Sequence, residues 1–223
     1  MSHAFAPVSP PRFRYNREVK RIFLLLLFAL TPFASAKTGA SKPVIVCFGD
    51  SITAGYGVDP GKSWPDGLQQ RLDAHGYHYR VLNFGVSGAT SKDGVSQLPQ
   101  ILAAHPQIVV VEFGGNDGLR GLPITATRAN LDRIIQTLQG AGIKVALVGI
   151  VMPPDYGPDY TRDFKETFVL AAKKFNVPLF PFILLHVYRV PGAMQADGIH
   201  PTAKGADIIA DDMYDFLKPM LRK

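Results

Sequence analysis

The sequence has a single cysteine, Cys47, and no hydrophobic run long enough to cross a membrane. One thiol excludes a disulfide within the chain. The longest apolar run, IFLLLLFAL, has nine residues, whereas a transmembrane helix needs about 20. The pattern HExxH, which places two histidines on one helix face to bind zinc, is also missing. We therefore expect no internal disulfide, no membrane-spanning helix and no metal site.

Basic residues are concentrated near the N-terminus. The chain has 24 Lys and Arg residues against 18 Asp and Glu residues, a formal net charge of +6. The first 36 residues contain five of the basic and one of the acidic residues, so the remaining 187 residues hold 19 and 17, a net charge of +2. No Lys/Arg-rich run that could follow a phosphate backbone remains. We expect no nucleic-acid partner.

The N-terminal segment has the three parts of a secretory signal peptide. Four basic residues lie within residues 14–21, the apolar run follows at residues 22–30, and Ala34-Ser35-Ala36 supplies small residues for a signal peptidase. A buried core helix is the alternative interpretation of the apolar run, and translation starting nearer Val19 is left open.

Cleavage is expected after Ala36. This assigns residues 1–36 to the signal peptide and residues 37–223 to one mature domain, which is long enough for a well-buried core. Lys37, and not a cysteine, follows the cleavage position, so no lipid is expected to anchor the mature protein to a membrane. The protein is predicted to be periplasmic or secreted.

Apolar runs of strand length alternate with longer segments of helical pattern. The runs are rich in β-branched and aromatic residues, as in strands that are covered on both faces. We predict strands at residues 43–49, 79–85, 108–114, 144–150 and 177–182. We predict helices at residues 64–75, 92–104, 125–139, 161–175 and 203–218. This alternation predicts an α/β fold, a three-layer sandwich with helices on both faces of a five-stranded parallel sheet.

Three of the predicted strands end in similar glycine-containing loops. FGDS ends the first strand, FGVSG the second and FGGND the third. Glycine lets the backbone turn tightly and bring N–H groups near a ligand. Ligands bind at the carboxyl ends of the strands in such sheets, so the topology alone gathers these loops at one edge.

The stretch GVDPGKS at residues 57–63 is similar to a phosphate-binding loop. Such a loop needs four residues between its first glycine and Gly-Lys-Ser/Thr, so that its amides can surround a phosphate at a helix N-terminus. Here three residues separate Gly57 from Gly61, and five separate Gly55 from Gly61, so neither glycine has the required spacing. Pro60 also lacks the backbone N–H that such a loop would use. We therefore interpret the stretch as a solvated turn before a helix.

Ser51 lies two residues beyond the last glycine of the first predicted strand. A serine hydroxyl becomes a nucleophile when a base takes its proton, and the base needs an acceptor that orients it. The segment DGIHP places Asp197 and His200 three positions apart, beyond the last strand. We predict that Asp197 holds the Nδ1–H of His200 and that Nε2 faces Ser51. Alone, Ser51 would be interpreted as a helix N-cap, and only the three residues together indicate catalysis.

Donors for a developing oxyanion are expected from the neighbouring loops. Gly88 in NFGVSGAT offers a backbone N–H, Asn116 in FGGND offers a side-chain amide, and the N–H of Ser51 is the third donor. Ser87 is a rival nucleophile because GVSGA approaches the motif G-x-S-x-G, although the last glycine is missing. Cys47 lies inside a strand pattern and is expected to be a small buried hydrophobe.

These motifs together resemble the SGNH, or GDSL-type, hydrolase family. The four marker residues of that family stand here as Ser51 in GDS, Gly88, Asn116 in GGND and His200 in DGIH. Their order and context agree over nearly all of residues 43–218, although isoleucine replaces the leucine of GDSL. The resemblance implies a flavodoxin-like strand order of 2-1-3-4-5, no cofactor, and transfer of an acyl group to Ser51 followed by its release to water.

Two loops are similar to those of family members described as thioesterases, lysophospholipases and arylesterases. These are NDGLRGLP at residues 116–123 and MPPDYGPDYTRDF at residues 152–164. In that group the loops shape the acyl pocket, so the resemblance implies substrate contacts at Leu119, Leu122, Met152 and Tyr156. We expect a monomer that hydrolyses carboxylic esters or thioesters of apolar acyl chains, with small-molecule substrates.

Two other functions stay open at this stage. The same residues could serve a carbohydrate or peptidoglycan O-acetylesterase, which activity confined to acetate esters would reveal. A non-catalytic binding module that has kept the fold is the second alternative, and the intact set of Ser51, Asp197 and His200 argues against it.

Overall fold

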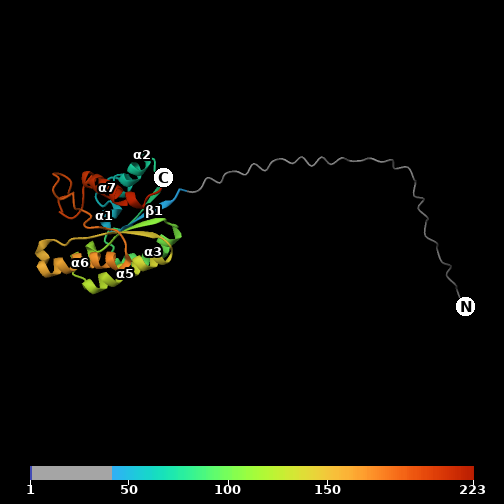
Figure 1. The fold of residues 1–223 in the computed structure, drawn as a ribbon, viewed down its shortest axis with the longest axis horizontal. Helices are drawn as coiled ribbons and strands as arrows, with labels where there is room; N and C mark the ends of the chain where they lie inside the picture. The colour runs from blue at the N-terminus through green and yellow to red at the C-terminus, as the bar shows by residue number, and fades with distance from the viewer. Residues whose placement is uncertain (2–41) are drawn as a thin grey trace. The chain divides into compact units, whose positions relative to one another are not determined.

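The computed structural model describes Met1 and residues 42–223. Apart from Met1, the predicted signal peptide at residues 1–36 lies outside the described residues, so the boundary after Ala36 stays a prediction. Figure 1 shows how the helices and strands of the described part are arranged.

A single sheet of five parallel strands lies at the centre of the fold. The strands are β1 (Val44–Gly49), β2 (Arg80–Gly85), β3 (Ile108–Glu112), β4 (Lys144–Val148) and β5 (Leu179–Phe180). Their order, β2-β1-β3-β4-β5, confirms the predicted one. β1 and β3 are buried along nearly their whole lengths, which explains why their sequences are apolar on both faces.

The last strand is shorter than the sequence predicts. Of the predicted range 177–182, only Leu179 and Phe180 pair with β4. Prolines at positions 178 and 181 flank these two residues, and proline has no N–H to donate to a neighbouring strand. The chain therefore leaves the sheet early and continues as the long loop that precedes the last helix.

Helices cover both faces of the sheet, as predicted (Figure 1). The longer ones are α2 (Trp64–Ala74), α3 (Ser91–Ala103), α5 (Ile124–Gly140), α6 (Pro158–Phe175) and α7 (Ala203–Leu217). α2 and α7 pack together on one face, and α3, α5 and α6 pack on the other. Among the described residues, no helix combines the length and the apolar character needed to cross a bilayer.

Short helices that the sequence analysis did not predict begin directly behind two of the sheet-edge loops. They are α1 (Ser51–Ala54) and α4 (Gly115–Leu119), and 3-10 turns lie at η1 (Pro154–Tyr156) and η2 (Lys218–Met220). Gly114, ahead of α4, has φ +124°, which favours glycine at this position.

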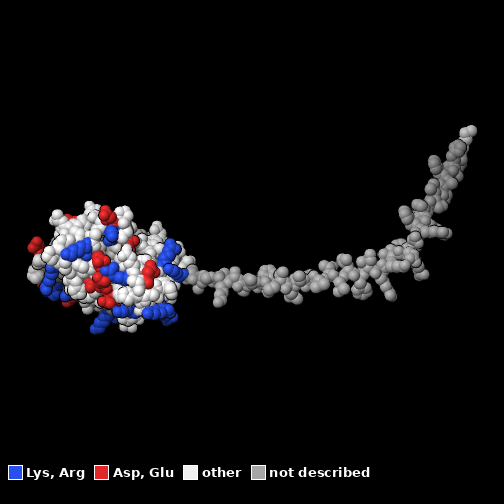
Figure 2. All heavy atoms as spheres, turned by 90° about the horizontal axis from the view of Figure 1, so that it is seen from above, with Lys and Arg blue, Asp and Glu red and all other residues white. Residues whose placement is uncertain are grey.

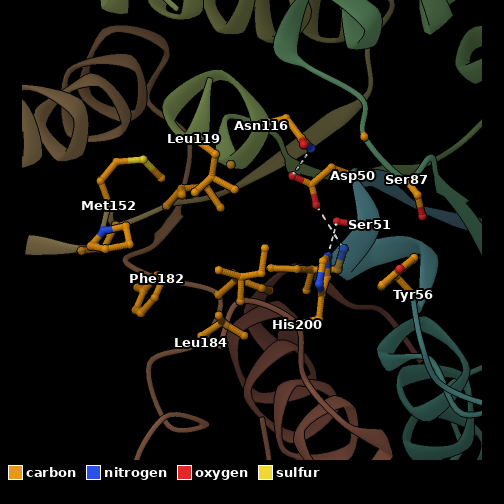
Figure 3. Close-up of a pocket in the computed structure, with 18 of the residues that line it drawn as sticks. Asp50, Ser51, Tyr56, Ser87, Asn116, Leu119, Met152, Phe182, Leu184 and His200 are labelled. Atoms are coloured by element: carbon orange, nitrogen blue, oxygen red, sulfur yellow. Dashed lines mark hydrogen bonds between the residues drawn. The ribbon is translucent and has the colours of Figure 1, made fainter. Parts of the chain in front are cut away.

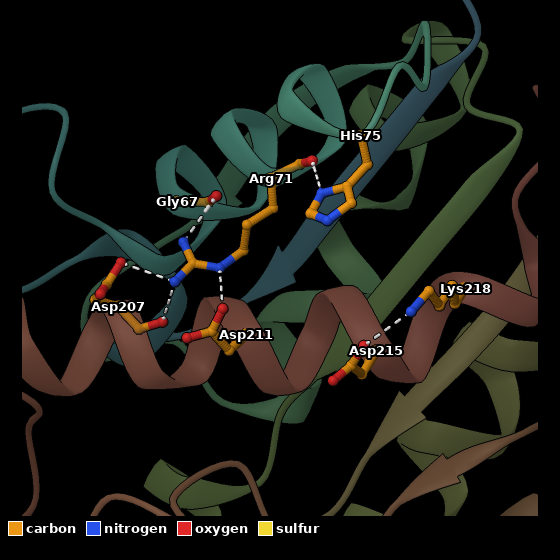
Figure 4. A network of polar contacts seen from close by, with 7 residues as sticks. All are labelled: Gly67, Arg71, His75, Asp207, Asp211, Asp215 and Lys218. Atoms are coloured by element: carbon orange, nitrogen blue, oxygen red, sulfur yellow. Dashed lines mark hydrogen bonds and ion pairs between the residues drawn. The ribbon is translucent and has the colours of Figure 1, made fainter.

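An arginine of α2 holds the helix layer of α2 and α7 together. Arg71 donates to carboxylate oxygens of Asp207 (2.9 Å) and Asp211 (2.6 Å) on α7, and to the carbonyl of Gly67 on its own helix (3.1 Å; Figure 4). The Arg71 side chain is 15% exposed, whereas both aspartates are largely exposed. The contact orients α7, whose N-terminus follows the loop that carries His200.

The stretch similar to a phosphate-binding loop forms turns between α1 and α2, as predicted. The N–H of Lys62 donates to the carbonyl of Asp59 (3.0 Å), and Ser63 caps α2 in a capping box with Asp66. Lys62 is exposed. The amides of this stretch therefore serve its own turns and the cap of α2.

Candidate active site

Ser51 is the first residue of α1, and only Asp50 separates it from the end of β1. The Asp50 side chain caps α1, because its Oδ1 accepts the N–H of Ile52 at 3.1 Å. β1 pairs with β2 on one side and with β3 on the other, so the loops that follow all three strands meet around Ser51. The position is the topological switch point of the sheet.

The structure brings Asp197 and His200 to Ser51. His200 Nε2 lies 2.8 Å from Ser51 Oγ, and His200 Nδ1 lies 2.7 Å from Asp197 Oδ2 (Figure 3 shows the serine and the histidine). A ring with its proton on Nδ1 donates to Asp197 and accepts the Ser51 hydroxyl proton at Nε2. This is the arrangement that the sequence predicts.

Asp197 is stabilised in its ionised form by its own loop. Its Oδ1 accepts the N–H groups of Ile199 and His200, each at 3.0 Å. Partial desolvation raises the pKa of Asp197, but the hydrogen bonds from His200 and Ile199 outweigh it and hold the pKa below its usual value. A negatively charged Asp197 can therefore orient the imidazole and stabilise it once it is protonated.

Gln195 joins the His200 loop to the Ser51 loop. Its N–H donates to the carbonyl of His200, and its Nε2 donates to the carbonyls of Pro201 and Tyr56, all at 2.8 Å. The Tyr56 ring in turn lies against the His200 ring, with 4.6 Å between the ring centroids. One side chain thus fixes two loops that are 139 residues apart in sequence. The sequence analysis missed Gln195, and its place five residues before His200 carries no recognisable motif.

The three predicted oxyanion donors line one cavity with His200. Asn116 Nδ2 donates to the carbonyl of Ala89 (3.0 Å) and to Asp50 Oδ2 (3.4 Å), so the amide has a defined orientation. Gly88 has φ +81°, and its carbonyl accepts a hydrogen bond from Arg120 (2.8 Å). Among the described residues, the N–H groups of Ser51 and Gly88 have no acceptor. They are thus available to a ligand.

The cavity has a volume of about 250 Å³ and an apolar wall on the side away from Ser87 (Figure 3). Its apolar lining residues are Ile52, Leu119, Ile150, Val151, Met152, Pro153, Phe182, Ile183, Leu184 and Ile199. Tyr56 and Tyr188 complete the lining near His200. An apolar chain attached to a carbonyl at Ser51 would be removed from water along this wall.

Two of the four predicted substrate contacts line the cavity and two do not. Leu119 and Met152 belong to the lining. Leu122 lies beyond α4, where its N–H donates to the carbonyl of Asp117 (2.9 Å), and it is not part of the lining. The Tyr156 hydroxyl donates to the carbonyl of Leu119 at 3.2 Å, and Tyr156 is not part of the lining either.

Much of the apolar wall was not recognised in the sequence. Phe182, Ile183, Leu184 and Tyr188 belong to the loop between β5 and α7. Their run, PFILLHVY, is apolar at successive positions, and only its first two residues fall inside a predicted element, the strand at residues 177–182. Only the early end of β5, caused by its flanking prolines, indicates that the run leaves the sheet at the edge where ligands bind.

The rival nucleophiles lack the contacts of Ser51. Ser87 lines the cavity, but its hydroxyl has no hydrogen-bond partner among the described residues. Cys47 is fully buried inside β1, where desolvation raises the pKa of its thiol. No group of three or more His, Cys, Asp or Glu side chains in the described part of the chain is placed to hold a metal ion.

Behind Ser51 lies a pair of buried carboxyl groups that the sequence analysis did not single out. Asp50 is 2% exposed and Glu112, the last residue of β3, is 0% exposed. Burial raises the pKa of Asp50 to about 6, against lowering contributions from the Ile52 N–H, His200 and Glu112. Burial and the neighbouring Asp50 raise the pKa of Glu112 well above its usual value.

A serine hydrogen-bonded to a histidine at the carboxyl edge of a parallel sheet is typical of serine hydrolases. Residues 47–208 match the GDSL-like lipase/acylhydrolase family. The chain belongs to this family, as the sequence motifs predict.

Named relatives align over most of the chain. Esterase TesA of Pseudomonas aeruginosa is 41% identical over 198 residues, which cover 88% of this chain and 96% of the relative. An arylesterase of Vibrio mimicus is 38% identical, covering 86% and 94%. Thioesterase 1/protease 1/lysophospholipase L1 of Escherichia coli K12 is 38% identical, covering 82% and 86%. A crystal structure of TesA, 42% identical, superimposes with a TM-score of 0.77 over 80% of this chain and 99% of that one.

Proposed function

We propose that this protein hydrolyses carboxylic esters and thioesters of apolar acyl chains, with Ser51, His200 and Asp197 as its catalytic triad. The observation that carries the proposal is the unbroken series of hydrogen bonds from Asp197 through His200 to Ser51, which opens onto a cavity with an apolar wall. The relatives named esterase, arylesterase and thioesterase support the same reaction class.

Acylation begins with attack by Ser51 Oγ on the substrate carbonyl carbon. His200 Nε2, 2.8 Å away, takes the hydroxyl proton as the new C–O bond forms, and Asp197 stabilises the resulting imidazolium. The carbonyl oxygen gains negative charge and accepts hydrogen bonds from the Ser51 N–H, the Gly88 N–H and the Asn116 amide, whose longer contact, 3.4 Å to Asp50 Oδ2, is then shared with the oxyanion. His200 then returns the proton to the leaving alcohol or thiol as its bond to the acyl carbon breaks.

Deacylation repeats the same steps with water. His200 takes a proton from a water molecule that attacks the acyl-enzyme ester, and the same donors hold the oxyanion. The proton then returns to Ser51 Oγ as the carboxylic acid leaves.

The lining of the cavity favours an apolar acyl chain over an acetyl group. Met152, Phe182 and Leu184 lie on one side of Ser51, and Tyr56 and Ser87 lie on the other (Figure 3). An acyl chain directed along the apolar side buries hydrocarbon surface, whereas an acetyl group would leave most of that wall without contact. The leaving group then lies toward Tyr56.

Two experiments test this proposal. A fluorophosphonate probe should label Ser51, located by peptide mass spectrometry, and should fail to label His200→Ala. For p-nitrophenyl esters, kcat/KM should rise from acetate to medium acyl chains. Activity confined to acetate would favour the O-acetylesterase alternative. Folded protein that neither reacts with the probe nor hydrolyses any ester would be a binding module.

We also propose that residues 1–36 direct export and that residues 37–223 are the mature enzyme in the periplasm or outside the cell. The basic segment, apolar run and Ala34-Ser35-Ala36 support this. Mass spectrometry of the protein from its producing cells should find Lys37 at the N-terminus, and an intact N-terminus in fully exported protein would contradict the cleavage position.

A further inference from the structure

Glu112 is a buried carboxyl group for which the proposed reaction has no use. Its Oε2 accepts hydrogen bonds from the Thr53 hydroxyl (2.8 Å) and from the Asp50 N–H (3.3 Å), whereas its buried Oε1 has no partner among the described residues. The Asp50 N–H that donates to Glu112 Oε2 belongs to the residue that carries the second buried carboxyl group, so the two groups are close neighbours. Two neighbouring carboxyl groups repel each other when both are ionised, so burial without a cation favours the state in which one of them keeps its proton.

The surroundings of the pair provide no positive charge to balance two negative ones. Among the described residues, no lysine or arginine forms an ion pair with Glu112 or Asp50. The titratable groups that face the pair are His200 and Asp117, which is itself buried and accepts hydrogen bonds from Ser91 and Thr127. A fully ionised pair would therefore place two unbalanced negative charges in a buried region, where only Asp50 reaches the cavity.

The backbone around the pair is built to enclose it closely. A Cβ added at Gly49 would lie 2.5 Å from Glu112 Oε2, and one added at Gly115 would lie 2.9 Å from Asp50 Oδ2. Both glycines belong to the loops FGDS and FGGND. Glycine at these two positions leaves space for the two carboxyl groups beside Ser51 and Asn116.

Asp50 connects the pair to the oxyanion donors. Its Oδ1 accepts the Ile52 N–H at the start of α1, and its Oδ2 accepts Asn116 Nδ2. Both carboxyl oxygens of Asp50 accept N–H groups, which suits the ionised form, whereas Glu112 Oε1 accepts none and is the oxygen that can carry the proton. A single charge on Asp50 fixes the amide of Asn116 and faces His200, which becomes positive during the reaction.

We propose that Glu112 and Asp50 are positioning residues that together hold one proton, with Glu112 neutral, so that only one negative charge lies behind the oxyanion site. A second negative charge there would repel the oxyanion and compete for the Asn116 amide. Ionisation of Glu112 should therefore lower kcat. Because this ionisation occurs as pH rises, activity should decrease at alkaline pH. The kinetic part of this inference depends on the proposed ester hydrolysis, and the proton count does not.

The kinetic test compares pH profiles of kcat for four proteins, with uncatalysed hydrolysis subtracted. Wild-type enzyme and Glu166→Gln, a control at the exposed glutamate of α6, should both lose about tenfold or more in kcat at alkaline pH. Glu112→Gln keeps a neutral side chain of the same shape and should lack this decrease. Thr53→Val removes a hydrogen bond that lowers the pKa of Glu112, so the decrease should move to higher pH.

The infrared test counts the proton without reference to activity. Wild-type protein at neutral pH should show the carbonyl band of a protonated, buried carboxylic acid, and Glu112→Gln should lack it. If Glu112→Gln does not fold, two observations still test the proposal: the carbonyl band of the wild-type protein, and the shift of the alkaline decrease in kcat to higher pH in Thr53→Val. A wild-type spectrum without this band at neutral pH, or a Glu112→Gln profile with the wild-type alkaline decrease, would overturn the proposal.

Discussion

The two halves of the catalytic site are supported in different ways. On the Ser51 side, Asp50, Thr53 and Glu112 are all buried, and the Asp50 N–H and the Thr53 hydroxyl both donate to Glu112 Oε2, so Ser51 rests on the core of the sheet. On the His200 side, the Asp197 side chain is 38% exposed and is held by N–H groups of its own loop. We expect changes on the Ser51 side to affect stability and activity together, and changes on the His200 side to affect activity alone.

The largest expected effect is the loss of the nucleophile. Ser51→Ala should lower kcat on the order of 10⁶-fold, because the attacking oxygen is removed. Its side-chain hydroxyl contacts only the exposed His200 loop, so the unfolding midpoint should change little. Steady-state kinetics measures the loss of kcat, and thermal unfolding measures the midpoint. Ser96→Ala, at an exposed position of α3, is the matched control and should retain wild-type kinetics.

Asp197→Asn should lower kcat by about 10⁴-fold, because an amide no longer holds the imidazole in the required tautomer. Asparagine can still accept the N–H groups of Ile199 and His200, so thermal stability should stay within about 1 kcal/mol of wild type. Asp73→Asn, at an exposed position of α2, is the control. A large loss of stability in Asp197→Asn would contradict the distinction between the two sides.

Asn116→Ala should lower kcat by about 10² to 10³-fold, because one oxyanion donor is lost. KM should change much less, since the donor acts mainly on the charge that develops in the transition state. Equal losses in kcat and in substrate affinity would instead assign Asn116 to substrate binding.

The buried carboxyl pair should make stability depend on pH. Folding raises the pKa of Glu112 above its unfolded value of 4.5, so the folded state binds more protons than the unfolded state above that pH. Its contribution to stability is complete below about pH 4.5 and is lost as pH rises through the raised pKa, by up to about 1.4 kcal/mol per pH unit. In urea unfolding experiments across this pH range, the free energy of unfolding of Glu112→Gln should change less with pH than that of the wild-type protein.

The smallest expected effect concerns the contact between the two sides. Gln195→Glu removes the donor that holds the carbonyls of Tyr56 and Pro201, and should lower kcat about tenfold by loosening the alignment of His200 with Ser51. Gln70→Glu, exposed on α2, is the control for the added charge. Unchanged kcat in Gln195→Glu would show that the His200 loop is positioned by Asp197 alone.

The fold and the positions of the proposed catalytic residues were accessible from the sequence for related reasons. Strands buried on both faces are apolar at every position, and parallel pairing brings the loops that follow them to one edge. Ser51 and Asn116 can therefore be placed near each other from the sequence alone. His200 and Asp197 were identified because their spacing matches a known chemical requirement.

The binding wall was less accessible, because apolar residues that line a cavity have the same composition as residues that fill a core. Phe182 and Leu184 line the cavity, but their sequence context does not distinguish them from core residues. Leu122 and Tyr156 were assigned from loop similarity, and a loop can place neighbouring side chains on opposite sides of its backbone. Glu112 was overlooked because a single charged residue at the end of a strand has no distinguishing pattern.

Ser51 and His200 are separated by 149 residues, close to the whole length of the domain. All five strands are complete before the chain reaches His200. A chain that stops short of the last loop therefore has every strand of the sheet but no base for its serine. Hydrolytic activity therefore requires synthesis and folding of the chain at least through His200, so an ester assay does not detect fragments that end before this residue.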